Sequence, residues 1–169
     1  MHRPSAEEFG RWVEQHQSMV FSIAYHILND RAAAEDVAQE VFLQLYDKFE
    51  SLESPEHMQY WLRRTTAHRA IDHGRRNNHH RHANIEDVPE PSVDAATSDP
   101  IFEKRLRTMI ASLPESARTI VILRYQEELG PDEIAKVLGM PLNTVKSQLH
   151  RALAILREKI SRTMGEIRI

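Results

Sequence analysis

One side of residues 142–162 carries side chains that suit the edges of DNA bases. In a helix, at about 100° per residue, the apolar residues of this segment form one stripe, and its hydrogen-bond donors and positive charges lie opposite. Arg and Lys match the acceptors of guanine, and Gln can pair with adenine. We therefore predict a duplex-DNA reader here, against the alternative of an ordinary basic surface helix. Its candidate readers are Asn143, Thr144, Lys146, Ser147, Gln148, His150 and Arg151.

A second basic cluster lies at residues 60–76, where aromatic side chains precede a run of arginines. This combination suits unstacked bases, which bind through stacking and phosphate contacts. The alternative for the aromatics is core packing, and for Trp61, which adjoins Leu62, the core is the favoured interpretation. The candidate nucleic-acid residues of this cluster are Tyr60, Arg63, Arg64, Arg69, Arg75 and Arg76.

An acidic face precedes this cluster, on residues 31–49. Asp36 and Glu40 are four residues apart, so a helix places them on one side, with Gln39 adjacent. Negative charge excludes DNA from this face, which leaves a solvated surface or a docking site for a basic partner. The candidate docking residues are Asp36, Gln39, Glu40 and Leu43.

The histidines His79, His80 and His82 raise the question of a metal site, because imidazole is a common ligand. No cysteine and no clustered carboxylate completes such a site in the sequence, so we expect no metal and no cofactor. The sequence also contains no phosphate-binding glycine loop and no suitably spaced pair of acids. We therefore predict that the protein is not an enzyme.

The DNA reader needs a second helix to hold it, and residues 130–139 supply one. Gly130 and Pro131 open that helix, since Pro at the first helical position forgoes no backbone hydrogen bond. Gly139 provides the turn into the next helix. The buried stripe of that next helix is Val145, Leu149, Ala152, Leu156 and Ile160. Together these signals predict a helix-turn-helix over residues 130–160.

Capping and breaking signals outline further helices, beginning with Ser5 before Ala6 and the break at Asn29 and Asp30. We expect helices from residue 6 to the break, then at 31–49, 55–77, 100–113 and 115–127. No strand pattern lies between them. The predicted fold class is all-α, with two small helical domains, 1–80 and 100–169, joined by a flexible acidic linker at 81–99.

Charge is segregated along the chain, although the net charge is only −3. Residues 63–82 hold six Arg against one Asp, and residues 142–162 hold five Lys or Arg against one Glu. Residues 83–103 hold six acids and no Lys or Arg. Basic runs suit phosphates, whose neutralisation releases counterions, so the pattern agrees with two nucleic-acid contacts.

The composition favours the cytosol. No apolar run approaches the roughly 18–20 residues of a membrane span. The N-terminal residues lack the apolar core of a signal peptide, and the chain has no cysteine. We expect no membrane insertion.

Three segments, in this order, resemble parts of the extracytoplasmic-function (ECF) sigma factors, small two-domain members of the sigma-70 family of bacterial transcription initiation factors. Residues 32–46, AAAEDVAQEVFLQLY, are similar to the part of region 2 that docks on core RNA polymerase. Residues 60–78, YWLRRTTAHRAIDHGRRNN, are similar to the part that melts and reads the −10 element. Residues 113–160, which include LGMPLNTVKSQLHRALAILREKI, resemble region 4, which reads the −35 element.

The resemblance implies a mechanism and three partners. Region 2 would dock on the clamp coiled coil of the largest polymerase subunit through Asp36, Gln39 and Glu40, and region 4 on the flap of the other large subunit. The readers at 142–162 would enter the −35 major groove, and the loop at 50–59 would hold a base flipped from the −10 strand. The linker would run through the polymerase toward its active-site cleft. Besides core polymerase and promoter DNA, relatives of this length commonly bind an anti-sigma factor.

One residue and one loop depart from the family pattern. Gln148 stands where relatives often have Arg, so the −35 sequence does not transfer, and the loop at 50–59 is less basic than many. A stand-alone repressor that uses only the helix-turn-helix is the main rival function, and it would bind duplex sites unaided, usually as a dimer. The third candidate function is a nucleic-acid-processing enzyme, which would need a catalytic acid, a nucleophile or a set of metal ligands that the sequence lacks.

Overall fold

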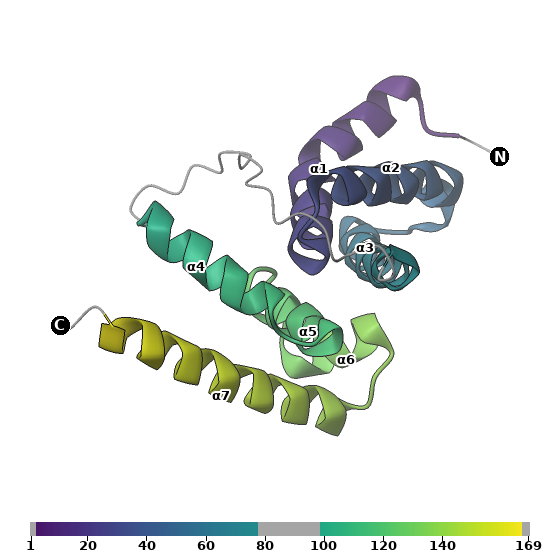
Figure 1. Ribbon diagram of the computed structural model, residues 1–169. Helices are drawn as coiled ribbons and strands as arrows, with labels where there is room; N and C mark the ends of the chain where they lie inside the picture. Colours follow the sequence, from purple (N-terminus) through teal and green to yellow (C-terminus); the bar gives the residue numbers. More distant parts are fainter. Residues whose placement is uncertain (1–2, 78–98, 167–169) are drawn as a thin grey trace. The chain divides into compact units, whose positions relative to one another are not determined.

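All regular elements are helical in the computed structural model, which describes residues 3–77 and 99–166 (Figure 1). The chain divides into two compact units between Asn84 and Ile85. The prediction of an all-α fold with two helical domains is therefore confirmed. The predicted linker at 81–99 lies, apart from Asp99, outside the described residues. No helix of the described segments is long and apolar enough to cross a bilayer.

The first unit contains α1 (Ala6–Leu28), α2 (Arg31–Lys48), the short 3₁₀ turn η1 (Phe49–Ser51) and α3 (Pro55–Asn77). Local capping sets these bounds. Ser5 Oγ accepts a hydrogen bond from Glu8 N at 3.1 Å, and Asp30 Oδ1 accepts one from Ala33 N at 3.1 Å. Between these two caps, Asn29 takes the left-handed conformation with φ 50°. The breaks expected from the sequence are confirmed.

The polar loop expected at 50–59 is shorter than its sequence indicated. η1 extends to Ser51 and α3 begins at Pro55, so only residues 52–54 lie outside helices there. Ser54 Oγ accepts from His57 N at 3.1 Å and caps the start of α3. Residues 55–59 are thus the start of the basic helix, as the helix predicted at 55–77 requires, and not part of the loop.

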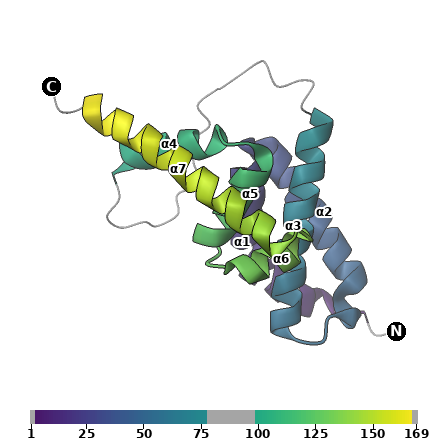
Figure 2. The same ribbon diagram turned by 90° about the horizontal axis from the view of Figure 1, so that it is seen from below.

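The core of the first unit is formed where each of the three helices packs against the other two. Figures 1 and 2 show this three-helix arrangement from two sides. Burial of one such aliphatic side chain contributes about 1.5–3 kcal/mol. The largest fully buried residues here are Val20, Ile23, Leu28, Val37, Val41, Leu45 and Leu62. Trp61, which we expected in the core, is only partly buried.

The second unit contains α4 (Pro100–Ala111), α5 (Glu115–Tyr125), α6 (Pro131–Leu138) and α7 (Leu142–Glu166). Asp99 caps α4 by accepting from Ile101 N at 3.0 Å. At the start of α6, Gly130 N donates to Glu133 Oε2 at 2.8 Å. Helix α5 ends two residues before the expected Glu127, because Glu128 has φ 55° and Leu129 turns back into the core.

Helix α7 packs along α4 and α5, and one side of it forms part of the core of the second unit (Figures 1 and 2). Of its predicted stripe, Val145, Ala152 and Leu156 are buried, and Leu149 and Ile160 are partly buried. Ala152 and Leu156 form one cluster with Leu113 and Val121. This packing fixes which side of α7 faces solvent.

Candidate nucleic-acid interface

The N-terminal half of α7 presents most of its candidate readers to solvent. Asn143, Lys146, Ser147, His150 and Arg151 are exposed, whereas Thr144 and Gln148 are partly buried at the edge of the face. The buried stripe on the opposite side produces this orientation, as the helical spacing predicted. This half of α7 carries the cations Lys146 and Arg151 and no acid, so the face is electropositive.

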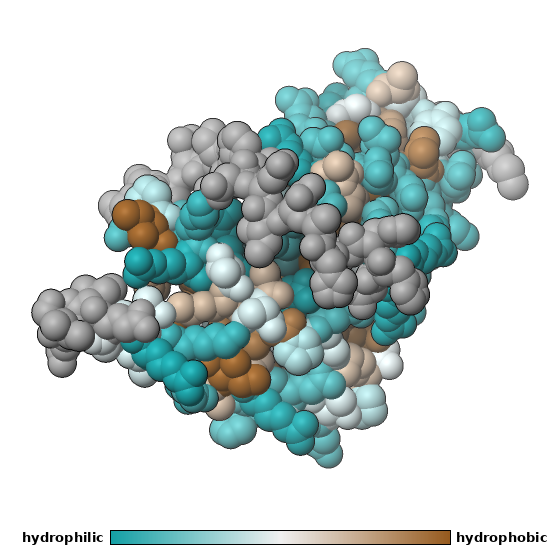
Figure 3. Space-filling model, in the orientation of Figure 1, coloured by the Kyte–Doolittle hydropathy of each residue, from teal (hydrophilic) through white to brown (hydrophobic). Residues whose placement is uncertain are grey.

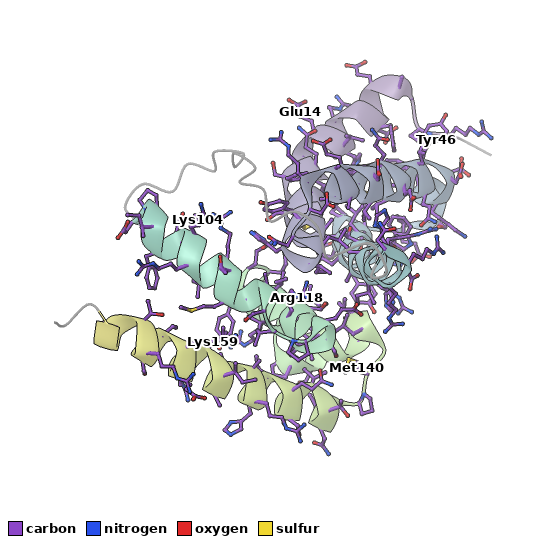
Figure 4. All side chains as sticks on the ribbon, in the orientation of Figure 1. Glu14, Tyr46, Lys104, Arg118, Met140 and Lys159 are labelled. Carbon is purple, nitrogen blue, oxygen red and sulfur yellow. The ribbon has the colours of Figure 1, made fainter. Side chains whose placement is uncertain are left out.

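The turn before α7 sets the angle at which this face is presented. Gly139 has φ 65°, a left-handed conformation that ends α6, and its neighbour Met140 donates its backbone N–H to Ala135 O at 3.0 Å. Met140 lies in the connection between α6 and α7 (Figure 4). Val145 N donates to Pro141 O at 3.1 Å and continues the new helix. The predicted helix-turn-helix is confirmed in its helices and its turn.

Gln148 has a partner that the sequence did not reveal. Ser116 Oγ on α5 donates to Gln148 Oε1 at 2.6 Å, in a partly buried contact between residues 32 apart in the chain. No periodicity within α7 carries information about α5, so only the folded structure shows this pair.

The basic residues further along α7 are largely engaged with the protein itself. Arg162 Nη2 lies 2.5 Å from Glu158 Oε1, and both side chains are well exposed, so the pair is worth about 0–1 kcal/mol. Lys159 Nζ donates to Ser112 Oγ at the end of α4, and Figure 4 marks Lys159 on α7. Arg157 is exposed. Two of the three basic residues on this part of α7 therefore have partners within the protein.

The basic cluster of the first unit lies along α3. Arg64, Arg75 and Arg76 are exposed, whereas Tyr60, Arg63 and Arg69 are partly buried. A polar depression of about 220 Å³ is formed by Arg64, Thr65, His68, Arg69 and Asp72. Its positive charge and size suit a phosphate group.

Two residues that the sequence assigned to different partners meet in the fold. Arg69 Nη1 on α3 lies 3.5 Å from Glu40 Oε2 on α2. The side chains are 37% and 50% exposed, so solvent screens the pair and its contribution to stability is about 0–1 kcal/mol. Arg69 therefore connects the basic helix with the acidic face.

The acidic face of α2 lies beside a large apolar groove between α1 and α2. Asp36, Gln39 and Glu40 are exposed, and Leu43, which also lines the groove, is 70% exposed. The groove has a volume of about 970 Å³. Its apolar lining includes Phe9, Val13, Phe21, Phe42, Leu43 and Tyr46. The Phe9 and Tyr46 rings meet edge-on, with centroids 5.2 Å apart.

The second unit also exposes apolar side chains, at the start of α4 and the end of α7. Ile101, Phe102 and Met164 are 64%, 50% and 62% exposed. In the space-filling view, most of the visible surface is hydrophilic, and an apolar patch stands out over the start of α4 (Figure 3). Each unit thus leaves apolar surface uncovered beside polar residues.

His16 is a buried polar residue that sequence reasoning missed. It is 7% exposed on α1, its ring stacks on Trp12 at 5.1 Å between centroids, and its Nε2 has no hydrogen-bond partner among the described residues. Burial lowers the pKa of His16, and the positive charge of Arg63 lowers it further. The spacing 9, 13, 16, 20 places His16 in the apolar stripe of α1 and was the available signal.

No three His, Cys, Asp or Glu side chains in residues 3–77 and 99–166 gather as a metal site. The histidines His79, His80 and His82, for which we expected no metal role, lie outside the described residues.

Comparisons with known proteins agree with this arrangement. The model of sigma-70 region 2 matches residues 12–80, and that of sigma-70 region 4 matches residues 103–156. The RNA polymerase sigma-E factor of Streptomyces coelicolor is 31% identical over 153 residues, covering 90% of this chain and 86% of the relative. The ECF RNA polymerase sigma factor SigW of Bacillus subtilis is 26% identical, covering 91% and 89%.

The fold has a solved counterpart. The sigma factor RpoE, crystallised with the anti-sigma factor NepR from Bartonella quintana, superposes with a TM-score of 0.72 at 19% identity, covering 92% of this chain and 98% of that one. The two matched regions define a transcription initiation factor of the sigma class. The chain belongs to the sigma-70 family, in its extracytoplasmic-function group.

Proposed function

We propose that this ECF sigma factor directs core RNA polymerase to promoters by reading the −35 element with α7 and the −10 element with α3. One observation carries the proposal: the unit that matches region 2 has a basic helix beside an acidic docking face, and the unit that matches region 4 presents an exposed basic helix-turn-helix. A sigma factor needs this combination, because it must bind polymerase and DNA at once.

The −35 element is read in the major groove by the exposed half of α7. This groove admits an α-helix and shows a distinct donor and acceptor pattern for each base pair. The proposed readers are Asn143, Thr144, Lys146, Ser147, Gln148, His150 and Arg151. Among them Lys146 and Arg151 carry the charge that phosphates or guanine attract.

The −10 element is bound and melted along α3. Bases extruded from a duplex cost a few kcal/mol, which stacking and phosphate contacts must offset. The proposed residues are Tyr60, Arg63, Arg64, Arg69, Arg75 and Arg76. Because only residues 52–54 form a loop before α3, the flipped base would contact that loop and the first turn of α3.

Core polymerase docks on the exposed face of α2, through Asp36, Gln39, Glu40 and Leu43. Support comes from the pairing of charge with exposed apolar surface, which is the composition of a protein interface with a polar rim and an apolar centre. The basic partner is the clamp coiled coil of the largest subunit, and the second unit docks on the flap of the other large subunit.

The functional domains that we propose are residues 1–80 for docking and −10 recognition, and residues 100–169 for −35 recognition, with 81–99 as the linker. We further propose that an anti-sigma factor covers the apolar surfaces of the free chain. The protein has no catalytic role of its own and acts in the bacterial cytoplasm, where the polymerase and promoters are.

Transcription in vitro tests this function. The purified chain is mixed with core polymerase and fragmented genomic DNA, and start sites are mapped. We expect specific transcripts that require both proteins and share two upstream elements. The same start sites with core alone, or none with both proteins present, would contradict the proposal. Tight binding of the chain alone to paired duplex half-sites would instead favour the stand-alone repressor.

A further inference from the structure

Ser116 contacts the reading face of α7 although it belongs to neither helix of the helix-turn-helix. It lies in the first turn of α5, and its Oγ is 2.6 Å from Gln148 Oε1. Both side chains are partly buried, so water competes less for this bond than at an open surface. The contact ties one candidate base reader to the scaffold of the second unit.

The direction of this hydrogen bond determines what Gln148 can offer to DNA. The Ser116 hydroxyl donates and the carboxamide oxygen accepts. Oxygen and nitrogen lie on opposite sides of the planar carboxamide, so an oxygen held toward α5 turns the Nε2 group, with its two hydrogens, away from α5. Within residues 3–77 and 99–166, the Gln148 side chain makes no other hydrogen bond.

We infer that Ser116 is a specificity-determining positioning residue that commits Gln148 to donate, rather than accept, hydrogen bonds at the −35 element. This inference rests on the proposed function, since it requires that α7 enters the −35 major groove. It adds a residue of α5 to those that decide the sequence this protein reads.

The base preference that follows can be derived from the edges of the base pairs. A glutamine recognises adenine by accepting from N6 and donating to N7 at the same time. With Oε1 held toward α5 by Ser116, the oxygen is turned away from the base edge, so donation from Nε2 to N7 is the contact that the side chain is placed to make. Guanine presents two acceptors, N7 and O6, and the two hydrogens of Nε2 can meet them. Gln148 therefore favours guanine over adenine at the base pair that it contacts.

The packing of α7 keeps this geometry in place. Leu149, next to Gln148, packs against the cluster of Leu113, Val121, Ala152 and Leu156, which spans α5 and α7. Rotation of α7 that would break the Ser116 contact would also disturb this cluster. The neighbouring cations Lys146 and Arg151 have donors and no acceptors, so they favour the same acceptor-rich edge.

The test measures base preference with the full chain and core polymerase. Promoters transcribed by the wild-type protein are isolated, their −35 segment is randomised, and the transcripts are sequenced. Ser116→Ala should raise the adenine-to-guanine ratio at one base pair by roughly 2- to 10-fold, the range of one net hydrogen bond. Ser116→Thr, which retains the hydroxyl, should keep the wild-type ratio. Gln148→Glu, which removes the donors, should move the preference toward cytosine, whose N4 donates.

A double variant separates positioning from a general structural role. In a Gln148→Ala background, Ser116→Ala should leave the base ratios unchanged, because the side chain that it orients is missing. An unchanged ratio in Ser116→Ala alone, or an equal change with and without Gln148, would overturn the inference while leaving the proposed function intact. A wild-type protein that shows no preference anywhere in the −35 segment would overturn the proposed function itself.

Discussion

The turn at Gly139 supports a quantitative prediction, because its strain can be isolated from packing. A Cβ at Gly139 would meet no atom within 4 Å, yet the residue has φ 65°. An alanine there therefore suffers only the left-handed backbone conformation, which costs an L-residue about 1–2 kcal/mol. The less flexible unfolded chain of the variant offsets about 0.4–1 kcal/mol of this. We expect Gly139→Ala to destabilise the second unit by about 1 kcal/mol.

Gly130 offers a matched control at the other end of α6. It has φ −71°, and an added Cβ would lie 3.7 Å from Glu133 Oε2, an ordinary contact. Gly130→Ala should gain about 0.4–1 kcal/mol from the unfolded chain, less the cost of alanine at the N-cap of α6, where glycine is favoured over alanine. The difference between the two variants should therefore be at most about 1–2 kcal/mol, the left-handed cost reduced by the N-cap cost at Gly130.

Native-state hydrogen exchange, measured on peptides of α6 and α7, gives the opening free energy of the second unit directly. A denaturant titration of the whole chain would instead combine the unfolding of both units in one signal. Gly139→Asn should recover much of the loss, since asparagine tolerates the left-handed region better than alanine does. Equal free energies for Gly139→Ala and Gly130→Ala would refute the reasoning.

Three further predictions concern single side chains. Arg151→Ala should weaken binding to the −35 element by roughly 1–3 kcal/mol, the cost of losing a base contact. Arg157→Ala, the control, should leave the −35 preference unchanged. Equal −35 preferences in the two variants would assign Arg151 to solvent or phosphate. Asp36→Arg should impair co-purification with core polymerase, while the circular dichroism spectrum, which reports helix content, stays unchanged. Glu14→Arg, which makes the same charge change at an exposed position on α1, is the control and should leave co-purification intact. The lowered pKa of His16 means that the unfolded chain binds a proton more readily than the folded one, so the first unit should lose stability as the pH falls from 7 through its unfolded value near 6.5. Denaturant titrations at several pH values should show that His16→Leu flattens this dependence, and an unchanged slope would contradict it.

Much of the helical framework could be predicted from the sequence because its signals are local. Ser5, Asp30 and Asp99 accept hydrogen bonds from first-turn amides of α1, α2 and α4, and Gly139 takes the left-handed turn. The stripe on α7 also follows from spacing alone, so the exposed reading face could be foreseen. The end of α5 was predicted two residues too late, because Glu128 takes the left-handed conformation and Leu129 N donates to Leu123 O at 3.1 Å.

Other features depend on which helices surround a residue, and the spacing of side chains does not contain that information. In the three-helix unit, Val37, Val41 and Leu45 of α2 fill the core, while Phe42 and Leu43 of the same helix line the groove. The Ser116–Gln148 bond requires knowledge of how α5 and α7 pack. The same holds for the ion pair of Arg69 with Glu40, which joins α3 to α2.

In the docking on core polymerase that we propose, the groove and its acidic rim would have different physical roles. Charge on an exposed rim is screened within about 8–10 Å, so Asp36 and Glu40 would act mainly on the rate and orientation of encounter. The exposed Leu43 and the apolar lining of the groove gain from leaving water, so they act mainly on the lifetime of the complex. A unit of this size buries only a modest core and leaves such surface open. The exposed apolar groove is therefore compatible with a stably folded free chain, and a partner can cover it on binding.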